Sequence, residues 1–530
     1  MPIALAPLPH PSSCAHRRTH HVSDAVASPI PESTPMASTD APVAAQSAER
    51  PRLDPRDKVT ITVLLLSAFV VILNETAMNV ALDAIIDDLG ITERLAQWLT
   101  TGFLLTMAVV IPITGWLQQR LTTRQTYALA MGLFVLGTLV AAASFGFWML
   151  LAGRIVQAAG TAIVFPLMMK TVMDLVPPGL RGLVMGNVSM VIACAPALGP
   201  TLSGVILQQL HWRFVFIVVL PIAIGFAVVG LSRLSDVNEV VAARLDWPSV
   251  PLAALGFGGS VYALSLIGDA AAPAWELPLA AVVGVAALVA FVLRQRVLQR
   301  TDDALLDLRT FRYALFTRSL LVMAIAMMAM FGSIIALPLV LQRALGLDPL
   351  LVGLVTLPGA LLMGLLGPVV GRIYDRRGPR VLLVPGSLVV LAALVGFATL
   401  LSVDTPLWMV LALHVTMSLG FAATFPVLFT VALGSVPRRL YGSGSAMVST
   451  LQQVAGAAGT ALFVTVLASQ SAALQAAGTP FDEAFVQGAR VAFLGGAIVW
   501  VAGILLATTV RRPDDVVVDR DHPAEEAPAV

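Results

Sequence analysis

Long apolar stretches alternate with short polar connections along most of this chain. A helix that crosses a bilayer needs roughly 20 predominantly apolar residues, and fourteen stretches are long enough. They lie at 59–82, 95–117, 125–146, 147–169, 183–207, 213–231, 247–268, 276–294, 318–341, 350–373, 381–402, 406–432, 443–468 and 489–510. Gly and Pro interrupt several of them, which membrane helices tolerate. The pattern predicts an all-α polytopic membrane protein with about 14 transmembrane helices.

The composition supports this class and excludes others. Of the 530 residues, 58% are hydrophobic and 12% are charged, whereas soluble domains carry roughly 25% charged residues. The net charge is +1 and no long run of Lys and Arg is present, so we expect no nucleic-acid partner. Two cysteines argue against a disulfide scaffold or a metal centre, and we expect no metal and no cofactor.

The two ends of the chain differ from its apolar middle. Residues 1–57 are rich in Pro, Ser, Ala and His and lack an apolar period, which is typical of a disordered tail. They also lack the apolar core of a secretory signal, and an alternative is that translation starts at Met36. Residues 511–530 are charged and are expected to form a second disordered tail.

Basic residues gather in the even-numbered connections between the apolar stretches. Arg120 and Arg124 follow the second stretch, Arg376 and Arg380 follow the tenth, and six arginines lie between residues 294 and 318. Cytoplasmic connections carry an excess of Lys and Arg. Both tails are therefore predicted to be cytoplasmic, as an even number of spans requires.

The fourth and twelfth stretches resemble each other. WMLLAGRIVQAAGTAIVFP (148–166) and WMVLALHVTMSLGFAATFP (408–426) share Trp-Met and Phe-Pro pairs at a constant shift of 260 residues. The shift from the fourth to the twelfth stretch is eight spans. Two adjacent six-helix halves would give a shift of six spans, so two additional helices must lie between the halves. Two parallel six-helix halves around a midplane site are typical of a secondary transporter.

These considerations divide the chain into five parts. They are a cytoplasmic tail at 1–57, an N-terminal six-helix half at 58–231, a two-helix insertion at 232–300, a cytoplasmic linker with the C-terminal six-helix half at 301–510, and a second cytoplasmic tail at 511–530.

Short motifs occur in a fixed order along the apolar stretches. The first stretch ends in LNETAMNVAL (73–82), the second is followed by GWLQQRLTTR (115–124), and the tenth is followed by GRIYDRRGPR (371–380). The motifs of the fourth and fifth stretches consist of Arg154, Gln157, Gly160, Gly186, Ala195, Gly199, Pro200, Ser203 and Gly204. Over about residues 58–510 this ordered set resembles the fourteen-helix drug:proton antiporter branch of the major facilitator superfamily.

The chain departs from the family pattern at three positions that bear on function. Gln119 stands where the family usually has Asp, and Thr122 where it usually has Gly. In the first stretch, Asn74 occupies the usual Asp position and Glu75 follows it. Asn74 cannot titrate, so a proton-carrying role is not transferred to it.

Four polar residues form a candidate site for proton coupling and substrate binding. Glu75 and Arg154 each lie seven residues from the outer end of their helices, which places both roughly 10 Å below the outer surface. Asn79 follows Glu75 by four residues and Gln157 follows Arg154 by three, so each helix presents one polar stripe. We expect the two stripes to face a central cavity.

A carboxylate in this position could exchange protons with both sides of the membrane. A cationic drug would favour the ionised form of Glu75, so that drug and proton compete for one site, as antiport requires. One alternative is a static Glu75–Arg154 pair that fixes helix packing. Another is that Glu75 faces away from the position of its family counterpart, because one residue turns a helix by about 100°.

Further candidates lie in the second half and in the connections. His414 occupies the position of Arg154 in the repeat and could handle protons, or could be a hydrogen-bonded packing residue. A methionine-rich cluster near Met327 could line an apolar cavity or simply pack. The resemblance implies a conformational gate at the connections, whereas the same charges could only set topology; the gate candidates are Arg120, Arg124, Asp375, Arg376 and Arg380. In the fifth stretch, Gly186, Gly199, Pro200 and Gly204 would permit close helix approach.

The function predicted from these features is proton-driven efflux of amphipathic, often cationic, drugs. The alternative is a dedicated exporter of one endogenous metabolite, peptide or lipid precursor, because fold alone does not separate the two. A membrane enzyme or a non-transporting sensor is disfavoured, since no cluster of His, Asp or Cys and no phosphate-binding GxxxxGK[ST] loop occurs. The expected partners are small substrates, protons and the bilayer, and the chain is expected to be a monomer. A high Arg-to-Lys ratio and abundant Ala suggest a GC-rich bacterial genome and the inner, cytoplasmic membrane.

Overall fold

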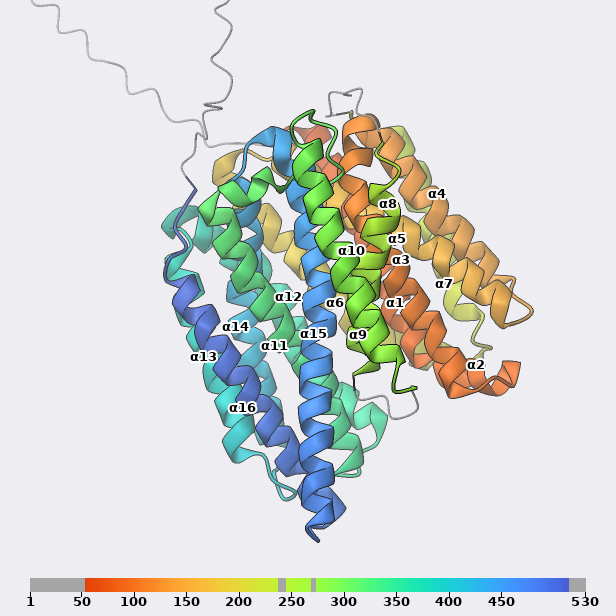
Figure 1. Cartoon of the computed structure of the whole chain (residues 1–530), viewed down its shortest axis with the longest axis vertical. Helices are drawn as coiled ribbons and strands as arrows, with labels where there is room; N and C mark the ends of the chain where they lie inside the picture. Colours follow the sequence, from red (N-terminus) through yellow and green to blue (C-terminus); the bar gives the residue numbers. More distant parts are fainter. Residues whose placement is uncertain (1–52, 237–244, 268–272, 514–530) are drawn as a thin grey trace, which may run out of the picture. The chain divides into compact units, whose positions relative to one another are not determined.

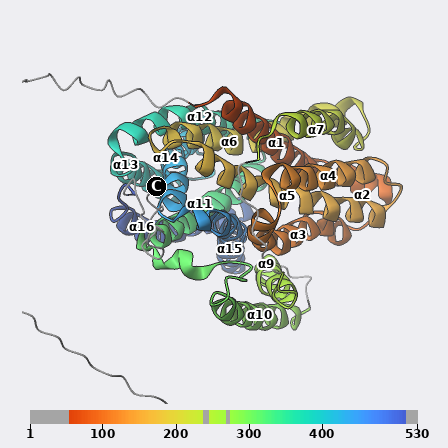
Figure 2. The same cartoon turned by 90° about the horizontal axis from the view of Figure 1, so that it is seen from above.

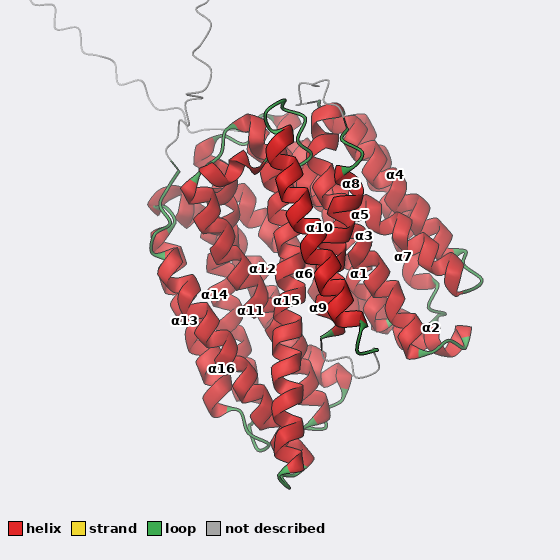
Figure 3. Ribbon diagram, in the orientation of Figure 1, coloured by secondary structure: helices red, strands yellow, loops and turns green. Residues whose placement is uncertain are grey.

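The computed structural model describes residues 53–236, 245–267 and 273–513 of the chain. Within these ranges every regular element is helical, and no strand occurs (Figure 3). The predicted tails at 1–57 and 511–530 lie almost entirely outside the described residues. The described parts form one compact unit.

The first half contains six long helices and two short elements. Their bounds are α1 (Pro55–Val80), α2 (Leu82–Leu89), α3 (Glu93–Arg120), α4 (Thr123–Ala142), α5 (Phe147–Leu175), the 3₁₀ turn η1 (Pro178–Leu180), α6 (Arg181–Gln209) and α7 (Phe214–Arg233).

The insertion consists of one interrupted and one continuous helix. Its elements are α8 (Ser249–Ala253), the π-helical turn η2 (Ala254–Gly258), α9 (Gly259–Leu266) and α10 (Glu276–Leu298). The predicted seventh span is therefore one helix path with a π turn in its middle.

The second half repeats the six long helices. After the 3₁₀ turn η3 (Leu308–Arg312) come α11 (Ala314–Arg343), α12 (Pro349–Arg377), α13 (Arg380–Leu400), α14 (Leu407–Gly434), the 3₁₀ turn η4 (Arg438–Leu440), α15 (Tyr441–Ala476) and α16 (Phe481–Ala507).

In the described residues, 14 helical segments are long and apolar enough to cross a membrane, which confirms the predicted number. Several predicted boundaries were wrong, and α16, for example, begins at Phe481 instead of residue 489. The first helix begins at Pro55, because the Asp54 carboxylate caps it by accepting a hydrogen bond from the Arg56 amide at 2.9 Å. It ends at Val80, and a separate amphipathic helix, α2, follows. Helix α15 continues to Ala476 instead of stopping at residue 468.

The two halves pack their helices in the same pairs, as the sequence repeat predicted. The pairs α4–α5, α1–α6, α3–α5, α4–α7 and α1–α7 of the first half recur as α13–α14, α11–α15, α12–α14, α13–α16 and α11–α16. Lipid removes most of the hydrophobic driving force between helices, so close backbone packing matters more here than in water.

The halves meet through two equivalent helix pairs, α6–α12 and α3–α15. Helix α6 of the first half corresponds to α15 of the second, and α3 corresponds to α12, so each pair repeats the other. The insertion lies on one flank of this junction, where α9 contacts both α3 and α15. Seen from above, α9 and α10 lie outside the two halves and beside α3 and α15 (Figures 1 and 2).

Candidate functional site

A buried polar network joins three helices of the first half. The guanidinium Nη1 of Arg154 donates a hydrogen bond to Gln157 Oε1 at 2.6 Å. The amide Nε2 of Gln157 donates to Asn74 Oδ1 at 2.7 Å and to Thr138 Oγ1 at 2.8 Å. Arg154, Gln157 and Asn74 are at most 1% exposed. The network therefore links α5 to α1 and α4 inside the membrane-spanning part of the fold.

Glycines on α4 and α5 make this network possible. A Cβ atom on Gly137 would lie 2.3 Å from the Gln157 backbone nitrogen, and one on Gly160 would lie 2.5 Å from the Ala130 carbonyl oxygen. Such distances are shorter than any real contact, so the two backbones approach as only glycine permits. This approach brings Thr138 within hydrogen-bonding distance of Gln157.

Arg154 also lies against an aromatic ring of α3. Its guanidinium carbon is 4.1 Å from the centroid of the Phe103 ring, and cation–π contacts of this kind favour arginine. Its Nε atom is buried and has no hydrogen-bond partner among the described residues. Phe103 and Thr138 belong to the site although the sequence analysis did not select them, because neither carries a charge or a motif that distinguishes it from other apolar-span residues.

Glu75 lies beside the network but is not part of it. Its side chain is half-buried, whereas that of its neighbour Asn74 is fully buried, and Asn79 one turn later is exposed. Glu75 and Arg154 interact electrostatically, but no hydrogen bond or ion pair joins their side chains in the described structure. The position that contacts Gln157 is therefore occupied by Asn74, and Glu75 is rotated from it by about 100° around α1.

His414 of α14 is a packed residue in this structure. Its side chain is 7% exposed, and Nε2 lies 3.1 Å from the backbone oxygen of Thr356 on α12. Gly359 makes room for the ring, because a Cβ atom there would lie 2.6 Å from His414 Cδ2. No hydrogen bond or ion pair joins His414 to the Arg154 network among the described residues.

Of the five predicted gate residues, Asp375 makes a contact between the halves. Its Oδ1 and Oδ2 atoms accept hydrogen bonds from the backbone amides of Gly182 at 2.8 Å and Leu183 at 2.9 Å. These amides belong to the first turn of α6, where N–H groups lack intrahelical acceptors. The four gate arginines are exposed, and their side chains have no hydrogen-bond or ion-pair partner among the described residues; they are Arg120, Arg124, Arg376 and Arg380.

Glycine pairs bring α6 and α12 into backbone contact next to Asp375. A Cβ atom on Gly186 would lie 2.1 Å from the Gly367 oxygen, and one on Gly371 would lie 2.0 Å from the Gly182 oxygen. The contact is lost toward the other ends of these helices, since Gly204 on α6 has nothing within 4 Å of its Cβ position. The halves are thus closed at the end where α6 begins and α12 ends.

The other predicted packing residues of α6 are Gly199, Pro200 and Gly204, and the two glycines do not share the α12 contact described for Gly186. Gly199 lies against α1, because its Cβ would be 2.1 Å from Thr76 Oγ1. Gly204 has open space where close packing was predicted. Pro200 lies within α6, and its side chain is outside the described part of the structure.

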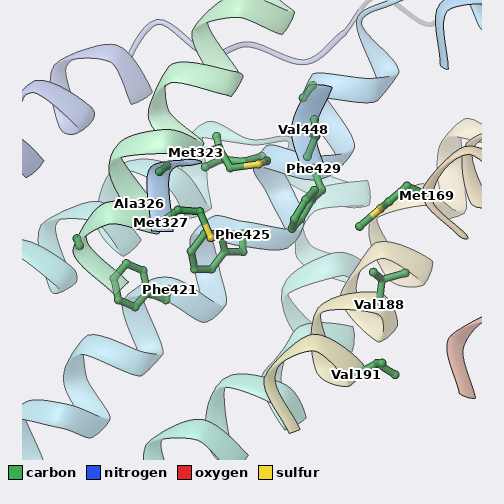
Figure 4. Close-up of a cluster of buried hydrophobic side chains, with 14 of the residues drawn as sticks. Met169, Val188, Val191, Met323, Ala326, Met327, Phe421, Phe425, Phe429 and Val448 are labelled. Carbon is green, nitrogen blue, oxygen red and sulfur yellow. The ribbon is translucent and has the colours of Figure 1, made fainter. Parts of the chain in front are cut away.

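An apolar cluster lies between α11 and α14 of the second half and α5 and α6 of the first half. Figure 4 shows Met323 and Met327 of α11 beside Phe421 and Phe425 of α14, with Met169, Val188 and Val191 of the first half nearby. Both methionines are at most 3% exposed. The Phe165 and Phe429 rings, one from each half, are 6.2 Å apart in an edge-to-face arrangement. In this conformation the methionine-rich cluster is packed.

The described residues contain no group of three His, Cys, Asp or Glu side chains that could hold a metal ion. The ionisable side chains at this site are those of Glu75 and Arg154.

Comparison with known sequences gives one family. A profile described as Major Facilitator Superfamily matches residues 64–460. The lincomycin resistance protein LmrB of Listeria monocytogenes is 38% identical over 457 residues, which cover 85% of this chain and 96% of that protein. The uncharacterized MFS-type transporter YcnB of Bacillus subtilis is 35% identical over 471 residues, covering 89% and 97%. A multidrug resistance protein B homolog of Mycobacterium tuberculosis is 28% identical over 447 residues, covering 81% and 82%.

Solved structures agree on the fold. The human organic anion transporter MFSD10 (TETRAN) has a TM-score of 0.61 at 17% identity, covering 86% of this chain and 100% of that one. The proton:xylose symporter XylE has a TM-score of 0.58 at 13% identity, covering 83% and 94%.

Proposed function

Because the chain belongs to the major facilitator superfamily, we propose that it is a secondary active exporter that exchanges protons for amphipathic, often cationic, drugs. The observation that carries this proposal is the half-buried carboxylate of Glu75 beside the buried Arg154 network. An ionisable group inside a membrane span is costly, and such groups in transporters serve ion or substrate pathways.

The coupling would be a competition at Glu75. An arriving cation favours the ionised carboxylate, and a proton that binds the carboxylate releases the cation. Arg154 is fixed by Gln157 and Phe103, so its charge stays in place while Glu75 changes its protonation state. Glu75 itself has no hydrogen-bond partner among the described residues, which leaves it free to bind a proton or a ligand.

Alternating access would expose this site to one side of the membrane at a time. The α6–α12 and α3–α15 contacts hold the halves together at one end, and opening this end requires the Asp375 hydrogen bonds to break. The basic connections at that end support a cytoplasmic location for it and for both tails. The high Arg-to-Lys ratio and the abundant Ala support a bacterial inner membrane, and we propose a monomer as the working unit.

The names of the relatives suggest the first substrates to test. LmrB is named for lincomycin resistance and the Mycobacterium tuberculosis relative for multidrug resistance. We therefore propose that lincomycin and cationic dyes such as ethidium are exported by this chain.

The test uses inverted membrane vesicles with an imposed pH gradient. Ethidium movement and lumenal pH are followed together for the native chain, for Glu75→Gln and for Glu276→Gln. Glu276 is a matched control because it is a carboxylate at the start of α10, away from the α1–α5 site. We expect the native chain and Glu276→Gln to move dye and protons in opposite directions, and Glu75→Gln to do neither.

Other outcomes are informative. Full coupling in Glu75→Gln would contradict its role as the coupling acid and would direct attention to His414. If the native chain moves neither ethidium nor lincomycin, the chain is better explained as a dedicated exporter of one endogenous compound.

A further inference from the structure

A cavity lies outside the two halves, where the insertion joins the second half. It has a volume of about 490 Å³ and lies between the last turns of α10 and the η3 turn. We refer to it as the linker pocket. Its lining includes three arginines, Arg296, Arg309 and Arg312, and no acidic side chain. Cavities of this size can hold small ligands or headgroups.

The linker that forms the pocket is held in place by buried hydrogen bonds. Gln295, which is fully buried, donates from Nε2 to Ser249 Oγ at 2.7 Å and accepts a hydrogen bond from the Leu306 amide at 3.1 Å. Thr310 Oγ1 lies 2.9 Å from Met447 Sδ of α15. The walls of the pocket are therefore fixed to the insertion and to the second half before any ligand binds.

The three arginines have different roles. Arg309 pairs with Asp302 and, at 2.6 Å, with Asp307, and these two carboxylates raise the pKa of Arg309 above its usual range. Arg296 and Arg312 are exposed, and their side chains have no partner among the described residues. These two side chains provide unpaired positive charge at the pocket.

A buried donor on the pocket wall also lacks an acceptor. The amide Nε2 of Gln299 is buried, and no described residue accepts a hydrogen bond from it. Buried donors are normally satisfied. The combination of two unpaired guanidinium groups and an unsatisfied amide indicates a ligand with several anionic oxygens, such as a phosphate group.

An apolar surface leads directly to this polar pocket. Helix α10 exposes a stripe of aliphatic side chains, 54–67% exposed, at helical spacing; they are Val282, Val285, Val289, Leu293 and Val297. The pocket lining adds Val292, Leu308 and Phe311, of which Phe311 is 44% exposed. Since α10 is a candidate membrane span that ends at Leu298, the pocket lies where the helix leaves the apolar layer.

We propose that the linker pocket binds the headgroup of an anionic phospholipid. Its phosphate contacts Arg296, Arg312 and Gln299, and an acyl chain lies along the exposed stripe of α10. The exposed stripe of α10, a candidate membrane span, would face lipid, so a phospholipid can contact both the stripe and the arginines, whereas a soluble phosphate compound would contact only the arginines. Charge at the membrane surface attracts anionic lipid, and the pocket adds a shaped site to this attraction.

The test is lipid binding to the purified full-length protein, followed by native mass spectrometry. Phosphatidylglycerol is titrated against phosphatidylcholine with the same acyl chains. We expect the native protein to retain at least one phosphatidylglycerol that phosphatidylcholine does not replace. The double variant R296Q/R312Q should lose that lipid, with affinity reduced about five-fold for each arginine.

A matched double variant separates this site from general surface charge. R233Q/R318Q removes two exposed arginines that do not line the pocket, and it should retain the lipid. Equal loss in both double variants, or full retention in R296Q/R312Q, would overturn the proposal. Displacement of the lipid by free glycerol phosphate at similar concentration would assign the pocket to a soluble phosphate compound instead. Unchanged thermal unfolding and dye transport in R296Q/R312Q would show that the variant is folded.

Discussion

Asn74 and Glu75 are neighbours in sequence but occupy different environments on α1. Asn74 is buried and accepts a hydrogen bond from Gln157, whereas Glu75 is half-buried and has no hydrogen-bond partner among the described residues. Asn74 therefore joins α1 to α5, whereas Glu75 is the residue to which the proposed mechanism assigns proton and ligand binding. This arrangement agrees with the idea that Glu75 is turned away from the position of its family counterpart.

The hydrogen-bond network predicts that the folded state loses stability when the side chain of Gln157, which joins the other members, is replaced. Gln157→Leu would leave Asn74, Thr138 and Arg154 without their buried partner. Each buried polar group left unsatisfied costs about 1–3 kcal/mol, so we expect a clearly lower unfolding temperature in detergent. Gln487→Leu, at a more exposed site on α16 where Gln487 donates a hydrogen bond to Glu483, is the control and should change it little. An unchanged unfolding temperature in Gln157→Leu would contradict the network.

At the scale of helices, close approach depends on glycines in particular places. Gly186 of α6 faces the backbone of α12, but Gly204, five turns further along, faces open space. Both glycines belong to the same sequence motif, and the motif alone does not show that only Gly186 lies against a neighbouring helix.

The glycine environments predict that the same substitution destabilises the protein at Gly186 but not at Gly204. Gly186→Val places side-chain atoms where the Gly367 oxygen lies, and overpacking of this kind costs typically about 1–3 kcal/mol. Gly204→Val has room. We expect Gly186→Val to lower the unfolding temperature and the transport rate, measured side by side with Gly204→Val, which should resemble the native chain. Equal behaviour of the two variants would contradict the α6–α12 contact.

A second contact between elements involves the short helix α2. Asp88 accepts hydrogen bonds from Trp212 Nε1 at 3.0 Å and from Arg213 Nη1 at 3.1 Å. These hydrogen bonds, together with the nearby His211, lower the pKa of Asp88 from 3.8 to about 2. The contact thereby fastens α2 to the connection between α6 and α7.

The lowered pKa gives a defined pH dependence. The ionised Asp88 stabilises the folded state above its unfolded pKa of 3.8, and this contribution is lost as the pH falls toward about 2. We expect Asp88→Asn to unfold at a lower temperature than the native chain at pH 6, and the difference to shrink between pH 4 and pH 2. A difference that stays constant over this range would show that the Asp88 carboxylate is not responsible.

At the scale of the whole molecule, the described conformation is closed at one end. The Asp375 carboxylate and the glycine contacts of α6 and α12 both lie there. The equivalent connection of the first half has Gln119 in place of the acid, so the charged contact is present on one side of the pseudo-symmetric junction.

The stability of this closed end can be measured through Cys194. Its thiol lies in the α6–α12 contact, 2.4 Å from the Cβ position of Gly364, and Cys14→Ser makes it the sole thiol of the chain. Asp375→Asn removes a negative charge from the first turn of α6, which is worth about 0.3–1 kcal/mol. We expect Cys194 to react about two- to five-fold faster with a membrane-permeable maleimide.

An exposed acid elsewhere provides the control for this experiment. Asp404→Asn removes a carboxylate on the connection between α13 and α14, and it should leave the labelling rate unchanged. An unchanged rate in Asp375→Asn would contradict its role in holding the halves closed.

The sequence by itself determined the membrane class, the number of spans and the repeated halves. Span length follows from bilayer thickness, and the repeat is visible as self-similarity, so both can be recognised without knowing how helices pack. The charged residues of the site could also be selected from the sequence, since a charged residue inside a long apolar stretch stands out without knowledge of the structure.

Only the tertiary structure decided which of these residues meet. One residue turns a helix by about 100°, so the choice between Asn74 and Glu75 depended on how α1 is rotated against α5. That rotation is set by contacts with other helices, such as Gly199 against Thr76. The closed end likewise arises from contacts between glycines on α6 and α12, which are nearly 200 residues apart in sequence. The linker pocket arises because the η3 turn lies against the end of α10. Such contacts depend on distances between segments that are remote in sequence. The hydrophobic pattern and the spacing of motifs give no information about these distances.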